Sequence, residues 1–295
     1  MQEKEWMIAG GSLYYVILDD EIAITGFRGM AGEVQIPDSL EGYPVTVIGK
    51  KAFLSRKFLR AVQLPDCIRE IEDWAFAYCD GLEQVELPDR EIRFGKAVFL
   101  ECSRLRSLDI RGKSRAAGAL LAAAVTRAEA YYLLNIPDVG SKEWLSKWDA
   151  RMLSVLKMPD QEGFSKQVLC GEEDYGSTDM TAYMSRRREE KVRLLLLRLL
   201  YPEGLEDSQR EEICRYLKEH TKGCESEETW QVVWKEHGTD RPYYQLFAEL
   251  GCLHRDNVEE ILKDIGEEYP EMKAFFLRYK EERLGYNDFF ADLEL

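Results

Sequence analysis

The stretch VQLPDCIREIEDWAFAYCDGLEQVELPD, Val62 to Asp89, states nearly the same motif twice, as VQLPD at its start and VELPD at its end. The second copy follows the first at a fixed step, from Val62 to Val85, and residues on both sides keep the same step. The columns are Ile48, Ile71 and Phe94; Phe53, Phe76 and Phe99; Leu59, Leu82 and Leu105; Val62, Val85 and Leu108; Leu64, Leu87 and Ile110; and Pro65 with Pro88. Cys79 and Cys102 also match, with Arg56 in the earlier copy. An internal repeat with a period of about 23 residues indicates a solenoid.

A unit of this length cannot bury its apolar face alone, so each copy stacks on the next. Within LxxVxLP the last two apolar residues are separated by one position, which is the alternation of a β-strand, and the proline ends that strand. The Phe column and the two cysteines are expected on the opposite wall of the interior. A small thiol packs there as a modest hydrophobe. A structural role for Cys79 and Cys102 is therefore favoured over a redox pair.

These motifs resemble the leucine-rich repeats of the bacterial surface-antigen (BspA-like) type. The resemblance rests on IPDSLEGYPVTVIGKKAF, LPDCIREIEDWAFAYC and LPDREIRFGKAVFLEC and covers roughly residues 20–112. The upstream LYYVILDDEIAITGFRG alternates apolar residues around Asp19 and Asp20, which predicts a hairpin that caps the first repeat. Because the chain has few repeats and its first residues lack an apolar signal sequence, the adhesion role of secreted members is not carried over.

Residues that lie between the inward strand positions are expected to face outward. They form two columns, Gln63, Glu86 and Asp109 beside Ala61, Gln84 and Ser107. Solenoids bind partners on such strand faces, although a merely solvated face is the alternative. An acidic column favours a basic partner. We therefore take these six residues as the candidate partner-binding face.

The composition limits the function further. The chain has 295 residues, a formal net charge of −15 and an isoelectric point near 4.9, which argues against nucleic-acid binding. The apolar runs, such as Leu194 to Leu197, are far too short to span a membrane. The seven cysteines form no CxxC pair. These features predict a cytoplasmic protein with free thiols and no membrane association.

The pattern changes after residue 112, and residues 113–295 are expected to form an α-helical domain. The Ala-rich run Ala116 to Leu134 predicts a helix that closes the solenoid, and Ser141 opens a helix with a core stripe of Trp144, Trp148, Met152 and Val155. LEDSQREEI and the later, similar LHRDNVEEI predict helical hairpins with capping boxes at Ser208 with Glu211 and at Asp256 with Glu259. The segment from Tyr243 to Lys280 resembles ankyrin-like hairpins.

Three groups in this domain are candidates for chemistry. Cys170 lies beside the acids Glu172 to Asp174, but no histidine is near in sequence, and the acids lack the alternation of a cation-binding loop. Arg186 to Arg188 precede Glu189 and Glu190, which favours an internally paired, solvated face over an anion or RNA site.

The third group consists of His220, His237 and His254 among Cys214, Cys224 and Cys252. Its spacing is not that of a zinc motif, and His220 and His237 fall where helices are expected to end.

The sequence therefore predicts an α+β protein. Residues 1–112 form a short leucine-rich-repeat β-solenoid with an N-terminal capping hairpin, and residues 113–295 form a domain of helical hairpins. The predicted function is a non-enzymatic protein-interaction scaffold without cofactor or metal. The alternative is an enzyme with a site around Cys170 and Glu172 to Asp174. The partner, the pathway and the oligomeric state stay open.

Overall fold

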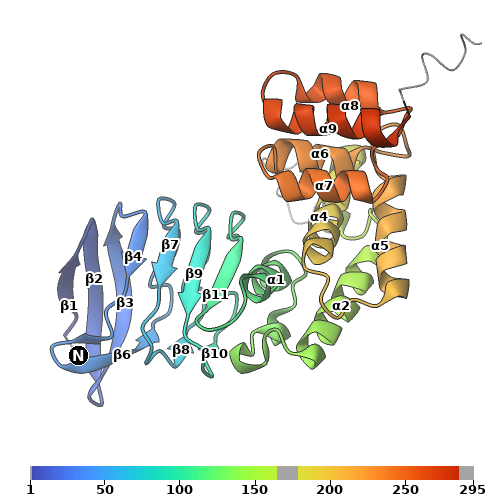
Figure 1. Ribbon diagram of the computed structural model, residues 1–295. Helices are drawn as coiled ribbons and strands as arrows, with labels where there is room; N and C mark the ends of the chain where they lie inside the picture. Colours follow the sequence, from blue (N-terminus) through green and yellow to red (C-terminus); the bar gives the residue numbers. More distant parts are fainter. Residues whose placement is uncertain (1, 165–178, 286–295) are drawn as a thin grey trace, which may run out of the picture. The chain divides into compact units, whose positions relative to one another are not determined.

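The computed structural model describes residues 2–164 and 179–285, which form two compact units, residues 1–151 and 152–295 (Figure 1). The boundary between the units falls within the helix α2 (Lys142–Lys157). It therefore lies well beyond residue 112, where the repeat pattern ends. Within these described ranges, no helix combines the length and the hydropathy needed to cross a bilayer.

The first unit is the predicted solenoid, with two rows of parallel strands. One row has the order β4-β7-β9-β11 and the other ends in β6-β8-β10. The first row consists of β4 (Glu33–Gln35), β7 (Ala61–Gln63), β9 (Gln84–Leu87) and β11 (Ser107–Ile110). The second consists of β6 (Tyr43–Ile48), β8 (Glu70–Ile71) and β10 (Arg93–Phe94), with the short β5 (Ser39–Leu40) paired to β6.

The phenylalanine column lies in the solenoid interior, as the repeat predicts. Phe53, Phe76 and Phe99 are at most 1% exposed, and their rings stack with centroids 5.0 and 5.7 Å apart. Phe27, from the hairpin before the repeats, extends the stack with a centroid 5.6 Å from that of Phe53. Each ring thus lies on its counterpart in the next turn, which is how a one-dimensional repeat builds a continuous core.

The N-terminal hairpin is confirmed, with an additional strand. β2 (Gly11–Leu18) and β3 (Glu21–Gly29) pair antiparallel, and β3 continues the sheet by pairing parallel to β6. Asp19 and Asp20 at the turn have positive φ, as a tight two-residue hairpin requires. β1 (Lys4–Ile8) pairs with β2 at the outer edge and was not expected from the sequence.

The predicted closing helix is shorter than the Ala-rich run. α1 (Arg115–Thr126) begins after Ser114, whose hydroxyl accepts a hydrogen bond from the Ala117 amide. Two 3₁₀ turns follow, η1 (Tyr131–Leu133) and η2 (Ile136–Asp138). α1 packs on β11, where the next repeat would otherwise stack. The solenoid end is thereby covered, because an open strand edge would expose unpaired backbone groups.

The second unit is helical. Its described helices are α4 (Met180–Leu200), α5 (Asp207–Glu219), α6 (Glu228–Glu236), α7 (Arg241–Glu249), α8 (Val258–Ile265) and α9 (Pro270–Arg283). Trp230 of α6 is 1% exposed and packs beside Tyr244 and Phe247 of α7 and Phe276 of α9, so these three helices share an aromatic core. The ankyrin-like character of this region stays a prediction.

The predicted capping boxes were wrong. α5 begins two residues earlier than expected, with Glu206 as its cap and a reciprocal hydrogen bond from the Glu206 amide to Gln209. At α8 the cap is Asn257, whose side-chain nitrogen instead donates to the backbone oxygens of Lys222 and Cys252. Asn257 is only 1% exposed, so its side chain serves packing between segments that are distant in sequence.

Candidate functional site

The predicted outward columns lie side by side in register. Gln63 pairs with Glu86 and Glu86 with Asp109, and Ala61, Gln84 and Ser107 align in the same way. The intervening Val62, Val85 and Leu108 point inward and are at most 2% exposed. All six predicted residues therefore occupy one strand face, which we call the β4–β11 face.

The face is wider than the sequence analysis anticipated. β4 pairs with β7, so Gln35 continues the column of Gln63 and Glu33 continues that of Ala61. The sequence carries the signal, since the motif VQIPD that ends at Asp38 recurs as VQLPD. These two copies are 28 residues apart, whereas the later copies keep a step of 23 residues. The first step also holds the short strand β5, which pairs antiparallel with the start of β6 and has no counterpart in the later copies that the structure describes.

Two carboxylates of this face, those of Glu86 and Asp109, have partners within the chain. Arg111, which the sequence analysis did not single out, places its Nε 2.9 Å from Glu86. Its guanidinium also pairs with Asp66 and donates to the backbone oxygen of Leu64. The side-chain amide of Gln84 donates to Asp109 over 2.6 Å. Of the two acids in the predicted column, Glu86 is therefore paired with a cation, whereas Asp109 keeps its charge and is bonded to a neutral amide. The pull of the column on a basic partner is weaker than the sequence suggested by one charge.

The end of the face at β11 is partly covered by α1. A Cβ built at Gly118 of α1 would lie 2.8 Å from Asp109 Oδ1, 2.9 Å from Ser107 Oγ and 2.9 Å from the backbone oxygen of Leu108. Only glycine allows the helix to approach this closely. Ser107 and Asp109 are half-buried, as are Ala61, Gln63 and Glu86 of the neighbouring strands. The exposed side chains of the face are those of Glu33, Gln35 and Gln84, on β4 and β9.

Cys79 and Cys102 are structural. Each thiol donates to the backbone oxygen of a phenylalanine one turn back, Cys79 to Phe53 over 3.0 Å and Cys102 to Phe76 over 3.1 Å. Both are buried, and burial raises the pKa of the Cys79 thiol to about 11 and that of Cys102 to about 12.

The candidate zinc ligands are dispersed. The His220 ring stacks on Tyr216 with centroids 4.0 Å apart, and the His254 ring contacts the Asn257 side chain at 2.9 Å. His220 and His237 end α5 and α6, as predicted. In the part of the chain that the structure describes, no group of three His, Cys, Asp or Glu side chains could hold a metal ion.

The arginine run on α4 does not form the predicted solvated face. Arg188 is half-buried, with its Nε 2.7 Å from Asp160, and Asp160 also pairs with Lys191 at 2.7 Å. Glu189 and Glu190 pair instead with Arg193. Asp160 precedes α4 by many residues, whereas Arg188 and Lys191 both lie on α4. Spacing within the helix therefore did not reveal that Asp160 joins them. Cys170 and Glu172 to Asp174 lie outside the described residues.

Comparison with known proteins agrees with this geometry. Residues 32–120 match the BspA type leucine-rich repeat region in six copies, so the first unit contains repeats of that family. No curated protein matches the chain.

Three solved structures of leucine-rich repeat proteins are similar to part of the chain. The leucine-rich repeat protein of T. pallidum is 31% identical over 35% of this chain and 48% of its own, with a TM-score of 0.32. One from Bacteroides capillosus is 27% identical over 38% of this chain and 90% of its own, with a TM-score of 0.32. A leucine-rich cell surface protein of Faecalibacterium prausnitzii is 26% identical over 37% of this chain and 32% of its own, with a TM-score of 0.31. The chain thus spans about half the length of the first of these proteins.

Proposed function

We propose that this protein is a non-enzymatic scaffold that binds another protein on the β4–β11 face. The observation that carries the proposal is the register of the strands, which brings Gln35, Gln63 and Glu86 into one straight column. Leucine-rich repeats are generally binding scaffolds, and solenoids commonly bind partners on such a face. A cytoplasmic location is part of the proposal, as the cysteine pattern predicts.

The chemistry of the face favours recognition by hydrogen bonds over attraction between net charges. Gln35 and Gln84 are exposed amides, which donate and accept, whereas Glu86 is held by Arg111. Binding through this face should accordingly depend little on ionic strength, because paired charges contribute little long-range steering.

The test is affinity capture from the native cell with the full chain as bait, followed by quantification of the partners in two variants. The double variant Gln63→Ala with Gln84→Ala removes one amide from each column without breaking an ion pair. Its matched control is Glu70→Ala with Arg93→Ala, which removes an exposed ion pair from the other strand row. Partners of the β4–β11 face should be lost from the first variant and kept by the second. Equal recovery of every partner from both variants would refute the proposed face.

A further inference from the structure

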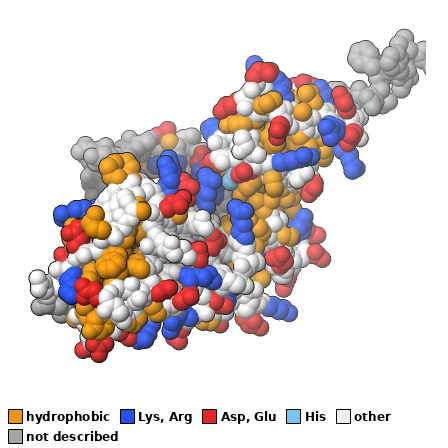
Figure 2. Space-filling view, turned by 60° about the vertical axis from the view of Figure 1, so that its left-hand side comes forward, with side chains coloured by type: hydrophobic (Ala, Val, Ile, Leu, Met, Phe, Trp, Pro, Cys, Tyr) orange, Lys and Arg blue, Asp and Glu red, His pale blue; other side chains and the backbone are white. Residues whose placement is uncertain are grey.

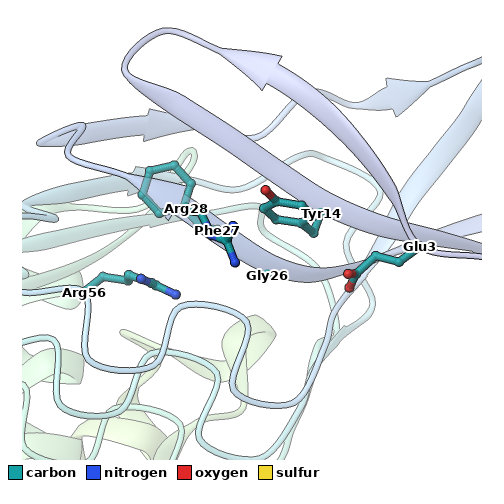
Figure 3. Close-up of a pocket in the computed structure, with 6 residues that line it drawn as sticks. All are labelled: Glu3, Tyr14, Gly26, Phe27, Arg28 and Arg56. Atoms are coloured by element: carbon teal, nitrogen blue, oxygen red, sulfur yellow. The ribbon is translucent and has the colours of Figure 1, made fainter.

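A small cavity lies between the N-terminal hairpin and the first repeat. It has a volume of about 180 Å³ and is lined by Glu3, Tyr14, Gly26, Phe27, Arg28 and Arg56. Figure 3 shows Arg56 reaching toward it from one side and Glu3 from the other. This volume is below the roughly 300–1,000 Å³ of cofactor sites, so the cavity suits a single side chain.

Arg56 is an exception to the repeat. Its position is taken by Cys79 and Cys102 in the following copies, where the thiol is buried and bonded to a backbone oxygen. The cysteines face the preceding repeat, whereas Arg56 in the first copy faces the N-terminal hairpin. A charged side chain thus replaces the interior thiol at a turn where a cavity opens beside that position.

The cavity is lined by two cations and one carboxylate, so one positive charge is in excess. Among the described residues, neither Arg28 nor Arg56 takes part in an ion pair, and Nε of Arg56 is buried without a hydrogen-bond partner. Arg28 lies over the Tyr14 ring, 5.4 Å from its centroid. The carboxylate in the cavity, Glu3, accepts a hydrogen bond from Thr25 over 2.6 Å. The excess of one positive charge among these lining side chains suits the site to an anion.

An apolar surface adjoins the cavity. A second cavity of about 270 Å³ shares Phe27 and Arg56 with the first and is also lined by Met30, Lys57 and Phe58. Met30 is 70% exposed and Phe58 is 60% exposed, which is unusual for large apolar side chains. Figure 2 shows hydrophobic side chains at the hairpin end of the solenoid, which comes forward in that view.

We propose that these two cavities bind an acidic segment of a protein partner, which is a second site beyond the β4–β11 face. A carboxylate side chain of the partner accepts hydrogen bonds from Arg56 and Arg28, and a neighbouring apolar side chain covers Met30 and Phe58. Planar guanidinium groups match a carboxylate in geometry as well as charge. A singly charged carboxylate fits better than a doubly charged phosphate, because Glu3 lines the same cavity and repels the larger charge more.

The test is fluorescence anisotropy with the full chain and a fluorescein-labelled peptide in which three Asp or Glu residues flank Phe-Leu. A second labelled peptide carries Asn and Gln in place of those acids. The acidic peptide should bind the wild type more tightly than the amide peptide. Arg56→Gln should weaken binding of the acidic peptide by about 10- to 100-fold, the usual loss for a charge-assisted hydrogen bond in a buried setting. Arg28→Gln should weaken it by less than about fivefold, because Arg28 is exposed.

Matched variants separate this site from general charge and from the β4–β11 face. Arg104→Gln removes the same charge from an exposed position of the last repeat and should leave binding unchanged. Phe58→Ser should weaken binding, whereas Tyr132→Ser, at a side chain with a similar exposure of 63%, should not. Gln63→Ala with Gln84→Ala should bind the peptide normally, so this site and the β4–β11 face can fail separately. Equal binding of both peptides, preference for inorganic phosphate over the acidic peptide, or an unchanged Arg56→Gln variant would overturn the proposal.

Discussion

The stacked phenylalanine column should make the centre of the solenoid more sensitive to truncation than its end. Phe76 is fully buried and stacks on two rings, Phe53 and Phe99, at 5.0 and 5.7 Å. Phe76→Ala should cost about 3–5 kcal/mol through lost burial and a cavity. Each stacked pair contributes about 0.5–1.5 kcal/mol beyond burial. Phe99→Ala breaks one described pair instead of two, so its cost should be smaller by about that amount.

Hydrogen exchange measured by mass spectrometry is the suitable assay, because a chain with two compact units need not unfold in one step. Amides of β7 and β9 should exchange about 100- to several-thousand-fold faster in Phe76→Ala, since about 1.4 kcal/mol corresponds to tenfold. Amides of the second unit should be unaffected if the two units unfold independently. Phe58→Ala is the matched control, because that ring is 60% exposed and its loss should change stability by less than about 0.5 kcal/mol.

If Phe76→Ala does not fold, Phe76→Leu keeps most of the apolar volume and loses both ring pairs, for about 1–3 kcal/mol. A loss for Phe76→Ala below about 2 kcal/mol would refute the stacked core. So would a loss no greater than that of Phe99→Ala.

Two further predictions concern ionisable groups. At pH 8 iodoacetamide should alkylate the thiols of Cys79 and Cys102 far more slowly than the exposed thiol of Cys224, because burial raises the pKa of Cys79 and of Cys102. If Cys79 in the folded protein were labelled as fast as Cys224, the burial of these thiols would be contradicted. Asp160→Asn should cost about 3–5 kcal/mol at pH 7, because it leaves the cation of Lys191 buried without its carboxylate. Burial alone would raise the pKa of Asp160, but the hydrogen bonds from Lys191 and Arg188 lower it below 3.8. The ion pairs therefore stabilise the fold above pH 3.8, and this stabilisation is lost as the pH falls through the folded-state pKa. The difference in unfolding free energy between wild type and variant should shrink in acid, and a constant difference from pH 7 to pH 2.5 would exclude this account.

The repeat determined most of what the sequence could predict about the first unit. Residues 23 positions apart lie next to each other once the turns stack. Phe53, Phe76 and Phe99 are therefore in contact. The same rule placed the outward columns in register. It did not predict β4, because the first step, which also holds β5, is 28 residues long instead of 23.

In the helical unit the sequence predicted element type better than element ends. The stripe of Trp144 and Trp148 is buried on α2 as expected. Helix starts were missed at α5 and α8, because several residues in a row can cap a helix and tertiary contacts decide among them. Asn257 shows this directly, since its side chain bonds to backbone groups of Lys222 and Cys252.

What the sequence by itself determined is the set of contacts that recur with the period: the stacked core, the strand register and the two outward columns. Only the tertiary structure decided which charges on those surfaces are neutralised. Arg111 meets Glu86, Gly118 brings α1 against Asp109, and Arg56 opens onto a cavity beside the hairpin. These contacts join residues with no periodic relation, and their energies depend on burial and on distances of a few ångströms. For residues without a periodic relation, a pattern along the chain does not indicate these distances.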